Sequence, residues 1–215
     1  MNIALYYAPF SCALVPYVML TEAEVSFDVR PLNIRGKANM TPEYLALNPK
    51  HKVPLLLVDG EPLSENVAIQ LWIARSFPHV RLLPTEPWAE AQAVSLLSWF
   101  ASGIHPGISR YNAPLKFCDV AGTEDSTRRL AGASLLEGFR LAEKMLEGRT
   151  YLLDEYSSAD IYLFWCFRRS GFFPGLDLSG FENIAAHSER LAERSSIRKA
   201  LALDDAVKQQ FGQEA

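Results

Sequence analysis

Cys12 is the first residue along the chain whose type and position are suited to chemistry. It follows an apolar stretch at residues 3–8 and stands, with Ser11 before it, where a helical pattern begins at residues 11–23. Backbone N–H groups at a helix start stabilise a thiolate, and Ser11 is a predicted cap. A helix end contributes at most about 2 kcal/mol, so alone it would leave the thiol only partly ionised. Because no C-x-x-C pair is present, a local dithiol is excluded, and a buried structural thiol is the alternative.

The step Val53–Pro54 is a second candidate, because it comes immediately before an apolar strand pattern. Proline lacks a backbone N–H and keeps the preceding residue extended. A cis bond here would turn the Val53 backbone toward the start of the first helix, leaving its N–H and C=O groups open to an extended, peptide-like ligand. Only about one X-Pro bond in twenty is cis, so a plain proline before a strand is the alternative.

A third candidate is the run Ser64, Glu65 and Asn66, where a strand pattern gives way to a helical one. A helix start offers backbone N–H groups to a ligand carboxylate, and Glu65 offers an acceptor to a ligand ammonium group. A capping cluster that binds no ligand explains the same residues.

The elements that must position these residues alternate between strand and helix over residues 1–78. Strands are predicted at 3–8 and 25–33, a hairpin at 53–65 with its turn at Asp59–Gly60, and helices at 11–23, 41–48 and 66–77. Thr41 and Pro42 are suited to the start of the second helix. A right-handed crossover would make the first two strands parallel, and the hairpin would add antiparallel partners. All three candidates would then lie at the carboxyl ends of the parallel strands, where open α/β sheets bind ligands.

The rest of the chain is predicted to be helical. Residues 79–87 are proline-rich and read as a linker, and residues 88–215 form the second domain. One long helix is predicted to reach the interruption at Pro106–Gly107, another to cover 123–148, and a largely apolar helix at 157–173 to be central. Helices at 180–196 and 197–203 follow.

Composition excludes several classes of function. The chain has 215 residues, a net charge of −4, and 49% hydrophobic and 21% charged residues, which is typical of a globular protein without the basic face of a nucleic-acid binder. No run approaches the roughly 20 apolar residues of a membrane span, and no signal peptide pattern opens the chain. Three scattered cysteines and no metal-ligand spacing predict a cytoplasmic protein without a disulfide framework or a metal.

Four stretches carry a family resemblance that covers nearly the whole chain. "YYAPFSCALVP", "NPKHKVPLLLVDG", "LSENVAI" and "SSADIYLFWC" resemble the bacterial beta class of the glutathione transferase superfamily. The resemblance implies a thioredoxin-like domain at 1–78 that binds glutathione, and an all-α domain at 88–215 that holds a small hydrophobic electrophile. It also implies a cytoplasmic homodimer with a role in detoxification, glutathione as co-substrate, and no metal, nucleotide, nucleic acid or membrane partner.

The resemblance also assigns the binding residues. Val53 would pair through its backbone with the cysteinyl part of glutathione, and Pro54, in a cis bond, would support it. Glu65 and the backbone N–H of Asn66 would hold the γ-glutamyl end; the family more often has Ser or Gly at the second place. Three basic side chains are candidates for a glutathione carboxylate, the first matching the family best: Lys37, Lys52 and Arg35.

Cys12 matches the cysteine that lies beside the glutathione sulfur in the beta class. That class usually has a serine directly after the cysteine, and here the residue is Ala13, so Ser11 or Tyr7 would have to donate a hydrogen bond to a thiolate. His105 matches a histidine that the second domain directs into the site. Its positive charge near neutral pH would lower the pKa of a thiol. Without the resemblance, His105 is an ordinary histidine at a helix end.

Two other functions stay open from the sequence. Cys12 could itself be the nucleophile of a glutathione-dependent thiol–disulfide or reductive enzyme. Alternatively, the departures at Ala13 and Asn66 fit a binding or regulatory protein of the same fold without enzymatic activity.

A capping box is also expected at the central helix. Ser157 would cap it and Asp160 would accept in return, a pairing that serves folding rather than function.

Overall fold

The structure, a computed structural model, describes residues 1–212 and divides into two compact units. The first contains Met1–Leu83 together with the described part of the segment that begins at Glu193, and the second contains Pro84–Ala192. The C-terminal helix therefore packs with the first unit. The domain boundaries predicted from the sequence, 1–78 and 88–215 with a linker at 79–87, placed this helix in the helical domain. As boundaries of folding domains they remain a prediction.

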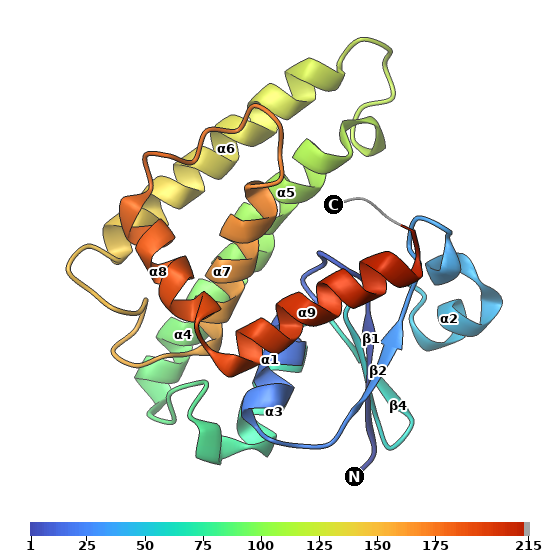
Figure 1. The fold of residues 1–215 in the computed structure, drawn as a ribbon, viewed down its shortest axis with the longest axis vertical. Helices are drawn as coiled ribbons and strands as arrows, with labels where there is room; N and C mark the ends of the chain where they lie inside the picture. The colour runs from blue at the N-terminus through green and yellow to red at the C-terminus, as the bar shows by residue number, and fades with distance from the viewer. Residues whose placement is uncertain (213–215) are drawn as a thin grey trace. The chain divides into compact units, whose positions relative to one another are not determined.

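The first unit is built on a mixed four-stranded sheet (Figure 1). Its strands, in the spatial order β2-β1-β3-β4, are β1 (Ile3–Tyr7), β2 (Asp28–Pro31), β3 (Leu55–Val58) and β4 (Glu61–Ser64). β1 and β2 are parallel, whereas β3 is antiparallel to both β1 and β4. The expected strand directions are confirmed. The hairpin turn falls at Asp59 and Gly60, whose φ values of 51° and 92° are the positive angles of a two-residue hairpin.

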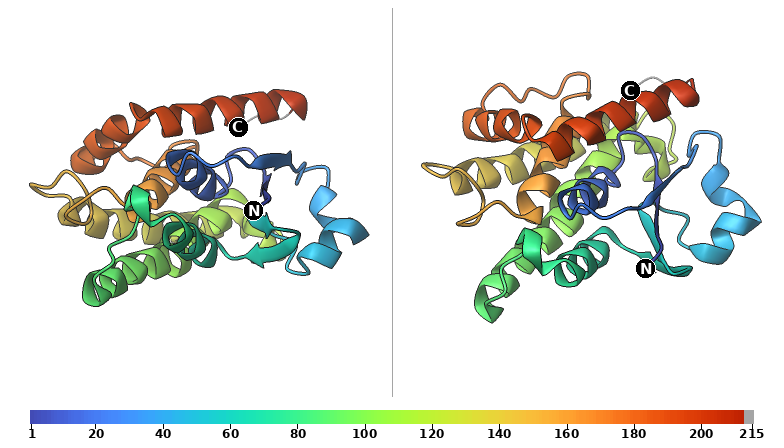
Figure 2. Two further views of the ribbon diagram at one scale, coloured as in Figure 1. Left: turned by 90° about the horizontal axis from the view of Figure 1, so that it is seen from below. Right: turned by 60° about the horizontal axis from the view of Figure 1, so that its bottom comes forward.

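The unit's helices are α1 (Leu14–Glu22), α2 (Pro42–Leu47), α3 (Asn66–Ser76) and α9 (Ser195–Gln210), with short 3-10 helices at Ala38–Met40 and Pro78–Val80. α1 packs against α3 on one face of the sheet and against α9, while α2 covers the other face (Figure 2). Thr41 caps α2, as expected, by accepting a hydrogen bond from the Tyr44 N–H.

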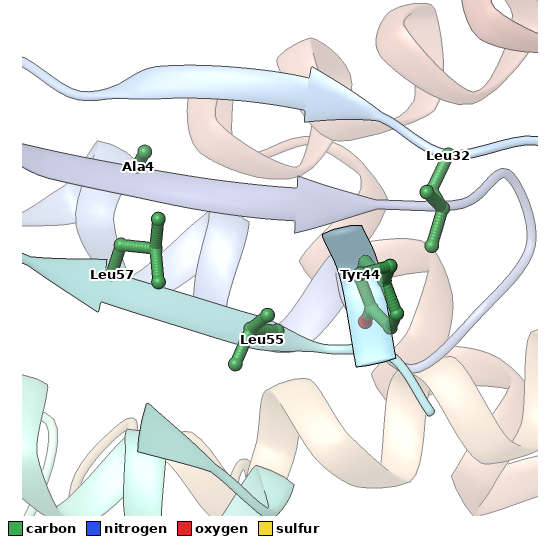
Figure 3. Packing of buried hydrophobic residues seen from close by; sticks show 5 residues of the cluster. All are labelled: Ala4, Leu32, Tyr44, Leu55 and Leu57. Atoms are coloured by element: carbon green, nitrogen blue, oxygen red, sulfur yellow. The ribbon is translucent and has the colours of Figure 1, made fainter. Parts of the chain in front are cut away.

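The α2 face of the sheet has its own small core (Figure 3). Tyr44 of α2 lies over the sheet, and the residue is 3% exposed. The cluster consists of Ala4, Leu32, Tyr44, Leu55 and Leu57. Burial of this apolar surface, about 25 cal/mol per Å², holds the α2 segment, and with it residues 48–53, against the sheet.

The loops that carry the candidate residues gather at one end of the sheet, called the sheet edge below. The register pairs Tyr7 with Pro31, Tyr6 with Leu55, and Leu55 with Ser64, so the end of β1, the start of β3 and the end of β4 lie in one row. Cys12 follows β1, Val53 precedes β3 and Glu65 follows β4.

The second unit is helical. It contains α4 (Pro87–Trp99), a π-helical segment (Phe100–Ile104), α5 (His105–Asn112), a 3-10 helix (Pro114–Lys116), α6 (Glu124–Met145), α7 (Ser158–Ser170) and α8 (Glu182–Ala192). α5 and α6 lie side by side (Figure 1), and α7, buried over most of its length, packs against α4, α5 and α8. The prediction of a central helix is confirmed. Within residues 1–212, no helix is both long and apolar enough to cross a membrane.

The predicted interruption at Pro106–Gly107 is wrong. The chain stays helical from Pro87 to Asn112, because a π-helical segment precedes the proline and His105 donates its N–H to the Phe100 carbonyl, five residues back. A π segment is a common way to accommodate a disturbance of the ordinary hydrogen-bond ladder.

The predicted capping box at α7 is confirmed. The Oδ2 atom of Asp160 accepts hydrogen bonds from the N–H and hydroxyl groups of Ser157, both at 2.9 Å. Its Oδ1 atom accepts from the Leu152 N–H and contacts His187 Nε2, each at 2.9 Å. One buried carboxyl group thus joins α7, α8 and the segment before α7.

Candidate functional site

Cys12 lies in the turn between β1 and α1, one residue before the cap. The helix begins at Leu14 with Ala13 as its cap residue, so the expectation that Ser11 caps α1 is wrong. Residues 8–12 form a turn in which Ser11 donates both its N–H and its hydroxyl to the Ala8 carbonyl, at 3.2 Å and 2.6 Å. The turn directs the Cys12 side chain into the protein, where the residue is 5% exposed.

Burial makes Cys12 a protonated thiol. Its S–H group donates to the Val53 carbonyl at 3.7 Å. Removal from water raises the pKa of Cys12 to about 12; the hydrogen bond of the Asn66 side chain lowers it, and the negative charge of Glu65 raises it further. The helix start does not lower the pKa of Cys12 below its ordinary value, because desolvation exceeds what a helix end can supply.

Val53 is held at the sheet edge by the segment before it. The Val53–Pro54 bond is cis, as the family resemblance implied. The neighbouring Lys52 carbonyl accepts hydrogen bonds from the Tyr44 hydroxyl at 2.6 Å and from Asn48 Nδ2 at 2.8 Å. These bonds fix the chain as it enters the site, so the backbone of Val53 is placed within contact of Cys12.

Glu65 and Asn66 begin α3 in an unusual backbone conformation. Glu65 has φ = 77°, a region that non-glycine residues rarely adopt and that is found mainly where a surrounding structure enforces it. Its carboxylate is well exposed and contacts Lys50 Nζ at 2.6 Å, an exposed pair worth at most about 1 kcal/mol. Glu65 can therefore exchange this partner for a ligand ammonium group at little cost.

The Asn66 side chain has a structural role that the sequence did not predict. It is buried, donates from Nδ2 to the Cys12 carbonyl at 2.9 Å, and accepts at Oδ1 from Gln70 Nε2 at 2.9 Å. The side chain thus ties the start of α3 to the Cys12 turn. The Asn66 backbone N–H remains the group predicted to contact a ligand.

Neither hydroxyl predicted to assist Cys12 is directed at its sulfur. Ser11 donates to the Ala8 carbonyl, and Tyr7, which is fully buried, donates to Asp204 Oδ1 at 2.6 Å. Each hydroxyl carries one proton, so neither Ser11 nor Tyr7 donates to Cys12 in this arrangement, and a catalytic role for either stays a prediction. Asp204 was missed; its one signal in the sequence is a carboxylate within an apolar helical pattern.

The predicted basic residues lie on the surface near these loops. Lys37 has a left-handed backbone at the start of a 3-10 helix, with φ = 59°, and both Lys37 and Lys52 are exposed. Arg35 is exposed in the same loop as Lys37. Their role toward a carboxylate stays a prediction.

His105 belongs to the second unit and is uncharged at neutral pH. Its Nδ1 atom lies 3.0 Å from the buried Tyr162 hydroxyl, and its ring packs edge-on against Trp165, with centroids 4.5 Å apart. Burial lowers the pKa of His105 to about 4. The expected positive charge near neutral pH is therefore wrong, and His105 offers hydrogen bonding only.

Among residues 1–212, no group of three or more His, Cys, Asp or Glu side chains is arranged to hold a metal ion.

Comparison with known proteins gives a consistent set of relatives. The family model "Glutathione S-transferase, N-terminal domain" matches residues 1–75. Glutathione S-transferase GstA of Escherichia coli O157:H7 is 29% identical over 93% of this chain and 98% of its own. The probable maleylacetoacetate isomerase 1 of Drosophila melanogaster is 30% identical over 87% of this chain and 76% of its own.

Solved structures agree with these relatives. A sphingomonad glutathione S-transferase complexed with glutathione is 28% identical, with a TM-score of 0.83 over 94% of this chain and 98% of that one. The bacterial beta class enzyme of Sphingomonas chungbukensis is 29% identical, with a TM-score of 0.82 over the same shares, 94% and 98%. The resemblance drawn from the sequence motifs is confirmed.

Proposed function

This chain belongs to the glutathione S-transferase family, and from that premise we propose that it binds glutathione at one end of the sheet of its first unit and joins the intact tripeptide, through its sulfur, to a small electrophile. The observation that carries the proposal is the convergence of Cys12, Val53 and the Glu65–Asn66 step, three segments far apart in sequence. Cys12 contacts both of the others, at 3.7 Å to the Val53 carbonyl and 2.9 Å between its carbonyl and Asn66 Nδ2.

Each part of glutathione has a matching group in this arrangement. The cysteinyl backbone would pair with Val53 in the manner of a short added strand. The γ-glutamyl ammonium group would replace Lys50 at the exposed Glu65 carboxylate, and the γ-glutamyl carboxylate would meet the N–H groups at the start of the 11-residue helix α3. The glycyl carboxylate would attract the nearby exposed lysines, Lys37 and Lys52.

The sulfur of glutathione would then lie beside Cys12. A protonated Cys12 can turn its S–H from the Val53 carbonyl toward a glutathione thiolate and so stabilise the negative charge. With an aromatic halide as acceptor, the thiolate attacks the carbon bearing the halogen, the S–C bond forms, the halide leaves, and the thiol proton passes to solvent. The role of a neutral His105 toward the acceptor stays a prediction.

The raised pKa of Cys12 argues against Cys12 as the attacking nucleophile, because only the thiolate attacks a disulfide. Thiol–disulfide exchange is therefore the less favoured reaction.

Isomerisation is a second candidate, favoured by the similarity to the probable maleylacetoacetate isomerase. An isomerase would return glutathione unchanged, whereas a conjugating transferase consumes it. Measuring free thiol during turnover of a maleyl substrate and of an aromatic halide distinguishes the two.

The experiment that tests the proposal is a conjugation assay with glutathione and chlorodinitrobenzene. We expect wild-type turnover that saturates with glutathione, a lower kcat in Cys12→Ala because the S–H donor to the glutathione thiolate is lost, and little disulfide exchange by either protein. Cys118→Ala, in the helical unit, is the matched control. Absence of glutathione-dependent turnover with every electrophile and maleyl substrate tried, in a folded protein, would reject an enzymatic role.

The predicted homodimer and cytoplasmic location remain part of the proposal. Light scattering coupled to size exclusion measures the first, and fractionation of the source cells measures the second.

A further inference from the structure

A carboxyl group from the last helix binds the turn that carries Cys12. Asp204 of α9 is fully buried, and its Oδ1 atom accepts hydrogen bonds from the Tyr7 hydroxyl at 2.6 Å and from the Phe10 N–H at 2.9 Å. Tyr7 is the last residue of β1, and Phe10 lies two residues before Cys12. One oxygen atom therefore binds the turn at its beginning and at its middle.

The turn contains one residue with a strained backbone, which a contact from outside the turn can stabilise. Phe10 adopts φ = 59°, in the left-handed region that a bulky side chain disfavours. Lys208, one helical turn after Asp204, lies over the Phe10 ring at 5.9 Å from its centroid. Since strained residues persist only where the surroundings enforce them, α9 is the element that enforces this one.

α9 has a second anchor that does not involve the turn. Arg194 pairs with Glu22 through two hydrogen bonds, at 2.9 Å and 3.2 Å, and the Ser196 hydroxyl donates to Glu22 at 2.6 Å. Glu22 is the last residue of α1. The Glu22 contact therefore holds α9 on the unit, whereas the Asp204 contact acts on the Cys12 turn, and the two are separable by mutation.

We propose that Asp204 is a positioning residue for the reaction: its carboxyl group sets the conformation of residues 8–12 and so the place of the Cys12 thiol and of the sulfur that binds beside it. This inference rests on the proposed function, since it concerns the same site. In this proposal Asp204 acts on the sulfur site through its hydrogen bonds with Tyr7 and Phe10.

The test compares four variants by two measurements that need no glutathione and by kinetics that use it. Asp204→Ala removes the acceptor, Asp204→Asn keeps one carbonyl oxygen, Tyr7→Phe removes one of the two donors, and Glu22→Gln weakens the other anchor of α9 as the matched control. Hydrogen–deuterium exchange of the peptide spanning residues 8–13 and peptide-resolved alkylation of Cys12 by iodoacetamide need no glutathione. Steady-state kinetics then give KM for glutathione and kcat separately.

We expect Asp204→Ala to raise the alkylation rate of Cys12 about tenfold and KM for glutathione about fivefold or more, with a smaller change in kcat. Asp204→Asn should bring the alkylation rate and KM for glutathione most of the way back to the wild-type values, and Tyr7→Phe should give values between those of the wild type and Asp204→Ala. Glu22→Gln should lower the melting temperature without changing the alkylation rate or KM. The inference is overturned if the Asp204 variants change alkylation and exchange no more than Glu22→Gln does. If Asp204→Ala does not fold, Tyr7→Phe and Asp204→Asn decide in the same way. If the wild type binds no glutathione, the proposed function fails, while exchange and alkylation still decide the role of Asp204.

Discussion

Replacing Asn66 by alanine tests the link between the start of α3 and the Cys12 turn. The substitution removes two hydrogen bonds of 2.9 Å and leaves the Cys12 carbonyl and Gln70 Nε2 buried without these partners. A neutral hydrogen bond contributes about 0.5–1.5 kcal/mol net, and a buried polar group left unpaired costs about 1–3 kcal/mol. Gln70 Oε1 already lacks a partner among residues 1–212, so the whole amide would be unsatisfied. We expect the free energy of unfolding to fall by about 2–4 kcal/mol.

The assay is urea unfolding, with Gln70→Leu as the second arm of a double-mutant cycle. Leucine removes the amide that Asn66→Ala would leave unpaired, so the double variant should lose less than the sum of the two single losses, with a coupling of about 1 kcal/mol or more. A loss below about 0.5 kcal/mol for Asn66→Ala would refute the reasoning. So would strict additivity of the two single losses, since additivity is the behaviour of distant, independent sites.

Three further outcomes follow from the buried ionisable groups. With its pKa raised to about 12, Cys12 should hold about a thousandfold less thiolate than an ordinary thiol, whereas the hydrogen bond from Thr123 lowers the pKa of Cys118. Peptide-resolved alkylation near neutral pH should therefore label Cys118 far sooner than Cys12. Equal alkylation rates would contradict this. The pKa of His105 is about 4 in the folded protein, against 6.5 for a free histidine, so between these pH values the unfolded chain binds a proton that the folded protein does not. The free energy of unfolding should therefore fall as the pH drops through this window, by about 2 kcal/mol at pH 5. His105→Gln should remove this part of the pH dependence of the free energy of unfolding, measured from pH 7 to 5. An unchanged pH dependence in the variant would disprove the assignment to His105. Asp160→Ala removes four contacts to one buried carboxyl group, so we expect a loss of at least about 4 kcal/mol in urea unfolding, with Asp160→Asn milder; a loss near zero would show that the capping box is dispensable.

Local patterns in the sequence predicted the parts of the fold that local physics determines. The Asp59–Gly60 turn, the Thr41 cap and the Ser157–Asp160 capping box involve residues at most a few positions apart. The order of elements then followed from strand and helix periodicity and from the handedness of the crossover. These rules also placed Cys12, Val53 and Glu65 at one sheet edge.

The electrostatics of the site could not be predicted in this way. The pKa values of Cys12 and His105 are set by burial, which depends on which segments pack around them. Burial raises the first, against the effect of the helix start, and lowers the second, so the expected charge on His105 near neutral pH is absent. The Tyr7–Asp204 contact joins residues 197 positions apart, and no periodicity connects them. The π segment before Pro106 also has no signal that distinguishes it from a helix end.

The most direct test of the account is a calorimetric titration of the folded protein with glutathione and with the dipeptide Cys-Gly, which lacks the γ-glutamyl group. The account predicts saturable heat from glutathione, a much weaker signal from the dipeptide, and a loss of that difference in Glu65→Gln. No heat from glutathione, or equal binding of the two peptides by the wild type, would contradict the claim that this sheet edge holds the tripeptide.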